Sequence, residues 1–235
     1  PGPMREGVIQ AHSAWIEEGV AIPAGELELM HKTGELISVY SQHLMLNEHT
    51  DAPLLFCVDV DLSDQKRAHR DLEFATRFDR LTHLPNRQTF EMDLDNLLES
   101  CRRVGNSLAT LYLDIDHFVE INDALGYDQG DRLLVELTRR LRECQRVTDL
   151  VSRVSSDEFV LAFPCGHLAT NVERVVRRIQ NVFRKPFVLD GRERQVTACL
   201  GVALFPENGD SSRELIRNAD VAKNRAKLEG RGTVR

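Results

Sequence analysis

The chain has 235 residues, of which 42% are hydrophobic and 29% charged, and its formal charge is −7. This composition excludes a disordered tail and a collagen-like rod. A net acidic chain is a poor partner for DNA or for an anionic membrane surface. Apolar runs such as Leu108–Leu113 are too short to cross a bilayer, and no signal peptide opens the chain, so we expect a cytoplasmic protein.

The cysteines are odd in number and widely spaced, with no C-x-x-C motif. They are Cys57, Cys101, Cys144, Cys165 and Cys199. This usage predicts reduced thiols and neither a disulfide framework nor a zinc site.

The first part of the chain predicts a small antiparallel sheet. Alternating residues indicate strands at 26–31, 36–40 and 54–60, and a short helix is expected around 11–18. From Ser63 the period changes, and a charged helix is expected to about residue 80. Its narrow apolar stripe favours a paired coiled coil, with a solvated linker as the alternative.

From Leu81 helices and strands alternate, which predicts an α+β fold with a sheet and helices packed on it. Helices are expected at 87–103, 131–146 and 170–183, and strands at 108–115 and 196–205. Two hairpins are expected to turn on Ser155-Ser156 and on Asp190-Gly191. The last helix opens with a capping box at Ser211 and ends before Gly230.

Acidic residues at two strand ends suggest a metal site. Asp114 and Asp116 flank Ile115, so both carboxylates are expected on one face. If the hairpin that carries Asp157 and Glu158 packs beside this strand, Asp157 and Asp114 share a hard cation such as Mg²⁺. A polar strand end and an ordinary acidic turn are the alternatives.

Further along the chain are residues whose side chains suit the guanine base and the phosphates of a nucleotide. Asn122 offers both a donor and an acceptor, and the Asp131 carboxylate can accept two donors from a guanine edge. The alternative is that glycines break this loop and Asp131 caps the next helix. Lys227 and Arg231, four apart, suit phosphate oxygens or serve as C-terminal helix cations.

From about Asp79 to Arg231 the chain resembles the GGDEF family, the diguanylate cyclase domains of bacterial cyclic-di-GMP signalling. Asp79–Arg87 is similar to D-x-L-T-G-L-P-N-R, and Leu113–Asp131 to D-x-D-x-F-K-x-x-N-D…G-x-x-x-G-D. Arg153–Phe159 stands in place of R-x-G-G-D-E-F, and Ala219–Arg231 matches the closing helix. The resemblance implies a palm-like domain at 81–235 with a central, mostly antiparallel sheet and packed helices.

The resemblance also implies roles for single residues. Mg²⁺ would be bound by Asp114, the Ile115 carbonyl and Asp157, with Asp157 and Glu158 as catalytic carboxylates. The implied nucleotide contacts are Asn122, Tyr127, Asp131, Ser155, Ser156, Lys227 and Arg231. The family joins two GTP molecules across an antiparallel dimer, so GTP, cyclic-di-GMP and a homodimer of the full-length protein are the expected partners.

An inhibitory site for cyclic-di-GMP is implied as well. Arg146 and Asp149 stand at the spacing of the family's R-x-x-D, and Arg177 on the next helix is expected to be a second contact. Arginine and carboxylate pairs suit the phosphate and the guanine of this ligand.

The departures from the family pattern concern the substrate. Ser155 and Ser156 replace two glycines, and a tight two-residue turn would place both at positive φ, at about 1 kcal/mol or more each. Their side chains also enter space where glycine lets a nucleotide approach. Val119 replaces a lysine, Tyr127 a histidine, and Lys223-Asn224 an apolar–Tyr pair. The expected metal ligands are kept, whereas these groups that shape the substrate site are lost. Together these two facts predict nucleotide binding with weak or absent cyclisation. An active diguanylate cyclase and a non-binding scaffold remain alternatives.

The flanking segments suggest a larger signalling protein. Residues 1–62 resemble the C-terminal part of a PAS domain, with 63–80 as a signalling linker helix. Gly201–Asp210 resembles GGDEF domains that are followed by an EAL phosphodiesterase. We therefore expect a regulatory domain that relays a PAS signal to an output domain.

Overall fold

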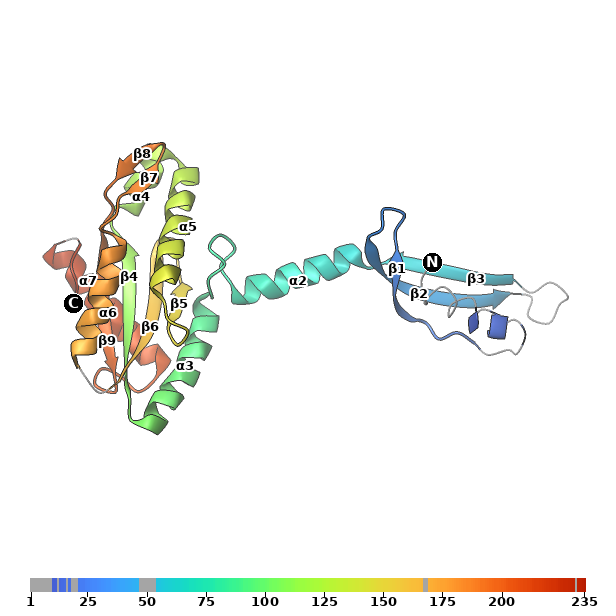
Figure 1. The fold of residues 1–235 in the computed structure, drawn as a ribbon, viewed down its shortest axis with the longest axis horizontal. Coiled ribbons are helices and arrows are strands. Elements are labelled where there is room, and N and C mark those ends of the chain that lie inside the picture. The colour runs from blue at the N-terminus through green and yellow to red at the C-terminus, as the bar shows by residue number, and fades with distance from the viewer. Residues whose placement is uncertain are drawn as a thin grey trace. The chain divides into compact units, whose positions relative to one another are not determined.

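The computed structural model describes residues 10–11, 13–15, 17, 21–46, 54–166, 169–230 and 232–235. The chain divides into two compact units, residues 1–73 and 74–235 (Figure 1). Among the described residues, no helix combines the length and apolarity that a bilayer crossing needs.

The first unit contains a three-stranded antiparallel sheet in the order β1-β2-β3. Its strands are β1 (Gly25–Met30), β2 (Leu36–Leu46) and β3 (Leu54–Asp61). The three predicted strands are therefore present, and β2 is longer than its alternation suggested. The backbone is helical at positions 10–11, 13–15 and 17, and the other positions of the helix predicted at 11–18 lie outside the described residues.

Helix α2 (Ser63–Arg77) is shorter than the predicted span to residue 80. It ends because the next residues pair elsewhere. Phe78 forms a β-bridge with Pro85, and the Asp79 carboxylate accepts hydrogen bonds from the backbone and the hydroxyl of Thr82.

A four-stranded antiparallel sheet in the order β5-β6-β4-β9 forms the centre of the second unit. Its strands are β5 (Leu150–Arg153), β6 (Glu158–Gly166), β4 (Ser107–Ile115) and β9 (Ala198–Phe205). The helices are α3 (Arg87–Val104), α4 (Phe118–Leu125), α5 (Tyr127–Cys144), α6 (Ala169–Val182) and α7 (Ser212–Glu229). A separate hairpin joins β7 (Phe187–Leu189) to β8 (Arg192–Arg194), as predicted around Asp190-Gly191.

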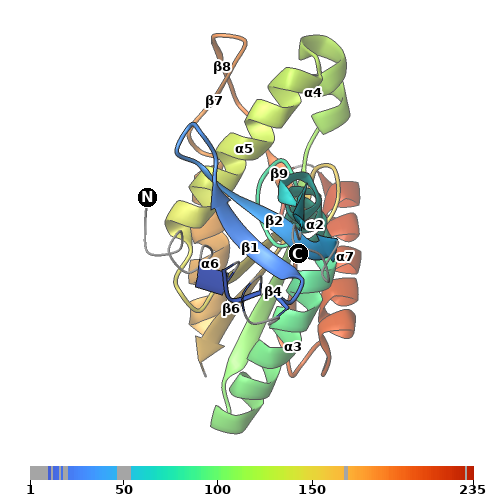
Figure 2. The ribbon, with the colours of Figure 1, turned by 90° about the vertical axis from the view of Figure 1, so that its right-hand side faces the viewer.

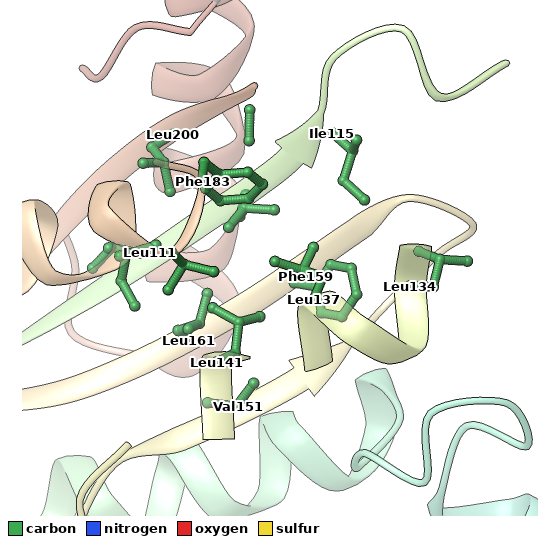
Figure 3. Packing of buried hydrophobic residues seen from close by; sticks show 14 of the residues in the cluster. Leu111, Ile115, Leu134, Leu137, Leu141, Val151, Phe159, Leu161, Phe183 and Leu200 are labelled. Carbon is green, nitrogen blue, oxygen red and sulfur yellow. The ribbon is translucent and has the colours of Figure 1, made fainter. Parts of the chain in front are cut away.

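Both faces of this sheet are covered, which explains why β4 is almost continuously apolar. Leu111 and Leu113 face a core built with α5 and α6, whereas Leu108 and Tyr112 face a core built with α3 and α7. Figure 2 shows the two helix pairs on opposite sides of the sheet. Figure 3 shows part of the first core, where leucines of α5 contact side chains of the central strands. The predicted α+β class is confirmed.

The segment after β4 differs from the prediction. It forms the extra helix α4, and α5 begins at Tyr127 rather than at residue 131. Gly126 separates the two helices with φ 86°, a conformation that suits glycine. Asp131 therefore lies inside α5 and does not cap it. The short, mixed pattern of residues 118–125 gave no clear helical period.

Helix α7 lies unusually close to β9 at Gly201. A Cβ built on Gly201 would lie 2.0 Å from the Ala219 carbonyl oxygen and 2.2 Å from the Lys223 backbone nitrogen. The helix begins as predicted, with Ser211 as N-cap accepting from the Glu214 N–H. The absence of a side chain at Gly201 therefore allows the second half of α7 to pack close against the sheet.

We predict that Gly201→Ala destabilises the second unit by about 1–3 kcal/mol, because the new methyl group must push the backbone of α7 outward. The measurement is urea unfolding. Gly25→Ala is the control, because its new Cβ would meet nothing within 4 Å. Equal unfolding midpoints for the parent chain and Gly201→Ala would contradict the close contact.

Candidate functional site

Two strand ends bring acidic side chains together. Asp114, near the end of β4, is the direct cross-strand partner of Glu158, the first residue of β6. Directly opposite residues project to the same face, here the face of α3 and α7. The Asp157 carbonyl accepts from the Ile115 N–H at 3.2 Å. Asp114 is buried, and burial raises the pKa of its carboxyl group, with the charge of Asp157 adding to the rise.

Two lysines of α7 neutralise part of this charge. Lys227, the lysine predicted to bind phosphate, pairs with the acidic cluster, with its Nζ 2.7 Å from Asp114 Oδ1. Lys223 Nζ lies 2.8 Å from Glu158 Oε1 and 2.8 Å from Asp220 Oδ1. Burial alone would lower the pKa of Lys223, but its hydrogen bonds with Asp220 and Glu158 outweigh burial and raise that pKa. Arg231, the other predicted phosphate ligand, lies outside the described residues.

The acidic residues suit one hard cation whose remaining coordination positions are filled by phosphate oxygens and water. Among the described residues, no group of three or more His, Cys, Asp or Glu side chains is arranged to cage a metal. Magnesium is commonly held by one or two carboxylates together with phosphate oxygens and water. Asp114 and Asp157 lie at neighbouring strand ends, because the Ile115 N–H donates to the Asp157 carbonyl, and two such carboxylates fit this kind of cation.

The loop between β5 and β6 corrects the prediction for the two serines. Val154 N–H donates to the Glu158 carbonyl, which leaves a three-residue loop at 155–157 instead of a two-residue turn. Neither Ser155 nor Ser156 has positive φ, so the predicted backbone strain is wrong. Both serines are exposed, and Ser156 Oγ lies 2.6 Å from Asp157 Oδ1.

Arg153 holds this loop to the segment that contains Asp79. Its guanidinium donates to the carbonyl oxygens of Ser155 and Ser156 and forms an ion pair with Asp79 at 2.9 Å. Burial opposes the charge on Asp79, but hydrogen bonds from Thr82 and Arg153 outweigh it and lower the pKa of Asp79. The position of Asp157 therefore depends on the segment before α3.

The residues predicted to read guanine lie where α4 meets α5. Asn122 contacts Gly130, where an added Cβ would lie 1.9 Å from Asn122 Oδ1. That oxygen is buried and has no hydrogen-bond partner within the described residues. Asp131 follows Gly130 and is exposed, as is Tyr127 at the start of α5. The structure thus places Asn122 against Gly130, the residue that precedes Asp131.

The R-x-x-D segment forms a second polar site. Asp149 is buried and accepts from the Arg146 N–H, while the Arg146 side chain is exposed. Arg178, not Arg177, pairs with Asp149 at 3.0 Å; Arg177 is exposed and pairs with Glu173 on its own helix. A cavity of about 330 Å³ lies here, lined by Arg146, Arg174 and Arg178 among others.

Asp116 does not join the acidic cluster. Its carboxylate accepts from the Thr197 hydroxyl, the Cys199 thiol and the Gly232 N–H. Its role is to attach the C-terminal segment to the end of the sheet. The alternation of D-x-D alone could not separate this anchor from Asp114.

The family model of the diguanylate cyclase GGDEF domain matches residues 76–233, which include all of these sites in the second unit. The chain belongs to the GGDEF family. The expectation from its motifs is confirmed, although the signature positions read Ser155-Ser156-Asp157-Glu158-Phe159.

Curated relatives come from longer proteins. The cyclic di-GMP phosphodiesterase NbdA of Pseudomonas aeruginosa is 39% identical over 74% of this chain and 22% of its own length. The bifunctional diguanylate cyclase/cyclic di-GMP phosphodiesterase MucR of the same organism is 36% identical over 70% of this chain and 24% of its own length. The chain therefore spans less than a quarter of these two relatives.

Solved GGDEF domains have the same fold. The GGDEF domain of TpbB from P. aeruginosa is 37% identical, with a TM-score of 0.64, covering 67% of this chain and 92% of that one. The GGDEF domain of DgcB from Caulobacter crescentus, in complex with c-di-GMP, is 25% identical, with a TM-score of 0.61, covering 68% and 92%.

Sequence reasoning missed three features of the GGDEF site. Lys223 was read only as the loss of an apolar residue, although a lysine at a buried helical position needs partners and thereby signals nearby acids. Arg178 was passed over for its neighbour, because the adjacent arginines gave no signal of which one faces the sheet. Tyr112 continues the apolar pattern of its strand, so the sequence carried no signal that its hydroxyl lies 3.0 Å from Glu158 Oε2.

Proposed function

We propose that this GGDEF domain binds GTP with Mg²⁺ at Asp114 and Asp157 and makes little or no cyclic-di-GMP. The observation that carries the proposal is the state of Glu158. One of its oxygens contacts Lys223 and the other contacts the Tyr112 hydroxyl, so the expected catalytic carboxylate is held on both sides.

The roles of the chain's own groups follow from this geometry. Asn122 and Asp131, at the junction of α4 and α5, would bind the guanine edge, and Lys227 would hold a phosphate oxygen after leaving Asp114. Mg²⁺, when bound, supplies positive charge for the phosphate oxygens. The exposed side chains of Ser155 and Ser156 would reduce the space through which the nucleotide approaches the loop backbone.

We also propose that the second polar site binds cyclic-di-GMP. Arg146 and Arg178 line the cavity and offer planar guanidinium groups to its phosphates, and Asp149 positions Arg178 through their ion pair. The complex of the DgcB domain with c-di-GMP supports this ligand. Nucleotide binding at these two sites would regulate an output domain such as an EAL phosphodiesterase, in a cytoplasmic, homodimeric protein whose 1–62 segment is part of a PAS domain.

An active diguanylate cyclase is the alternative. It is favoured by the cross-strand pairing of Asp114 with Glu158, which keeps the carboxylates side by side.

The test of the first site is incubation of the protein with GTP and Mg²⁺, together with calorimetry. We expect GTP binding that is lost in Asp114→Ala, and product formation far below about 1 per second. Turnover at or above that rate would establish the active cyclase instead. Absence of binding to both GTP and cyclic-di-GMP would leave a non-binding scaffold.

For the second site, we predict that Arg178→Ala lowers the affinity for cyclic-di-GMP by about tenfold or more, because a charge-assisted hydrogen bond is lost. Arg177→Ala is the matched control and should change the affinity less than about twofold, since its exposed side chain pairs with Glu173 on its own helix. A larger effect for Arg177→Ala in calorimetry would contradict the assignment.

A further inference from the structure

Lys223 is the one buried lysine or arginine in the part of the chain that the structure describes. Its side chain is 4% exposed, although it belongs to a helix whose neighbouring cations, such as Lys227, reach solvent. A buried ammonium group is costly unless acids surround it, so its position needs an explanation beyond packing.

The surroundings of the Lys223 ammonium group resemble those of a bound cation. Three carboxylates face it: those of Asp220 and Glu158 at 2.8 Å each, and that of Asp114 at 3.6 Å. The ring of Tyr112 closes another side, with its centroid 4.6 Å from Nζ. An ammonium group has three donors and no acceptor, so it can serve several acids at once.

The backbone of Lys223 is also fixed in place. The Cβ position built on Gly201 lies 2.8 Å from the Lys223 Cα, and Gly201 is the cross-strand partner of Tyr112. The side chain therefore starts at the sheet surface and crosses the Tyr112 ring to reach Glu158.

The local charge limits how many metal ions the cluster can hold. The cluster holds four carboxylates (Asp114, Asp157, Glu158 and Asp220) and two ammonium groups, so its formal charge is −2. The nearby Arg87 pairs with Glu91 and adds no net charge. One divalent cation balances this cluster, whereas a second would lie against the Lys223 ammonium group.

We propose that Lys223 is a built-in counter-ion that restricts the site to a single divalent cation, bound at Asp114 and Asp157, by occupying the position beside Glu158. The inference rests on the proposed metal site at Asp114 and Asp157. It assigns Lys223 as a positioning residue that holds Glu158 away from the metal, and it makes the residue at 223 a determinant of metal stoichiometry.

The test is titration of the nucleotide-free protein with Mn²⁺, with free Mn²⁺ measured by electron paramagnetic resonance. We expect one weak site in the parent chain. Lys223→Met removes a positive charge close to the carboxylates, so the affinity should rise by about tenfold or more, and a second ion should bind. Lys223→Gln should give the same result and carries the test if Lys223→Met does not show cooperative thermal unfolding.

Two further variants complete the set. Lys223→Arg keeps the charge and should stay within about threefold of the parent affinity. Lys185→Met removes an exposed lysine outside the cluster and should change nothing. Unchanged or weaker Mn²⁺ binding in both Lys223→Met and Lys223→Gln would overturn the inference.

The result is separable from that of the proposed function. If the parent chain binds neither GTP nor cyclic-di-GMP while Lys223→Met gains Mn²⁺ affinity, the proposed nucleotide function fails and the counter-ion role stands. If the parent chain binds GTP but the Mn²⁺ stoichiometry of the variants is unchanged, the counter-ion role fails alone.

Discussion

Ion pairs join Lys223 and Lys227 of α7 to the acids at the ends of β4 and β6. These ion pairs set the charge of the acidic cluster and the positions of its side chains. They cross from a helix to the sheet in a largely buried space, where charges interact more strongly than in water. They form because α7 lies directly on Gly201, so a single missing side chain in β9 brings the helix within reach. The close packing of α7 at Gly201 is therefore what allows the lysines to pair with the acids.

Much of the fold could be predicted from the sequence, because long elements carry strong periodic signals. The apolar run of β4, the face of α5 and the cap of α7 at Ser211 were all recognisable. Helix α4 was missed since eight residues show little more than two turns of pattern. The end of α2 was placed too late because the β-bridge between Phe78 and Pro85 is a tertiary contact.

The site was predictable in its residues but less so in its contacts. Motif spacing identified Asp114, Asp157 and Glu158, and the cross-strand register places Asp114 opposite Glu158. It could not show that the loop at 155–157 avoids positive φ, because loop length depends on which backbone pair closes the hairpin. Nor could it show that Arg178 rather than Arg177 turns toward Asp149, since that depends on the rotation of α6 against the sheet.

The same chemistry explains how a GGDEF domain could keep nucleotide affinity while losing turnover. Binding needs a cation, a phosphate partner and groups for the guanine edge, and the proposed function assigns these roles to Asp114 with Asp157, to Lys227, and to Asn122 with Asp131. Turnover also needs a carboxylate free to act on the reacting hydroxyl, and Glu158 is held by Lys223 and Tyr112.

The most direct measurement is anomalous diffraction from crystals grown with Mn²⁺ and a non-hydrolysable GTP analogue. The account predicts one Mn²⁺ peak, between the Asp114 and Asp157 carboxylates, with Lys223 still in contact with Glu158. Two peaks with Glu158 as a ligand, or a nucleotide bound with no metal at Asp114, would contradict it.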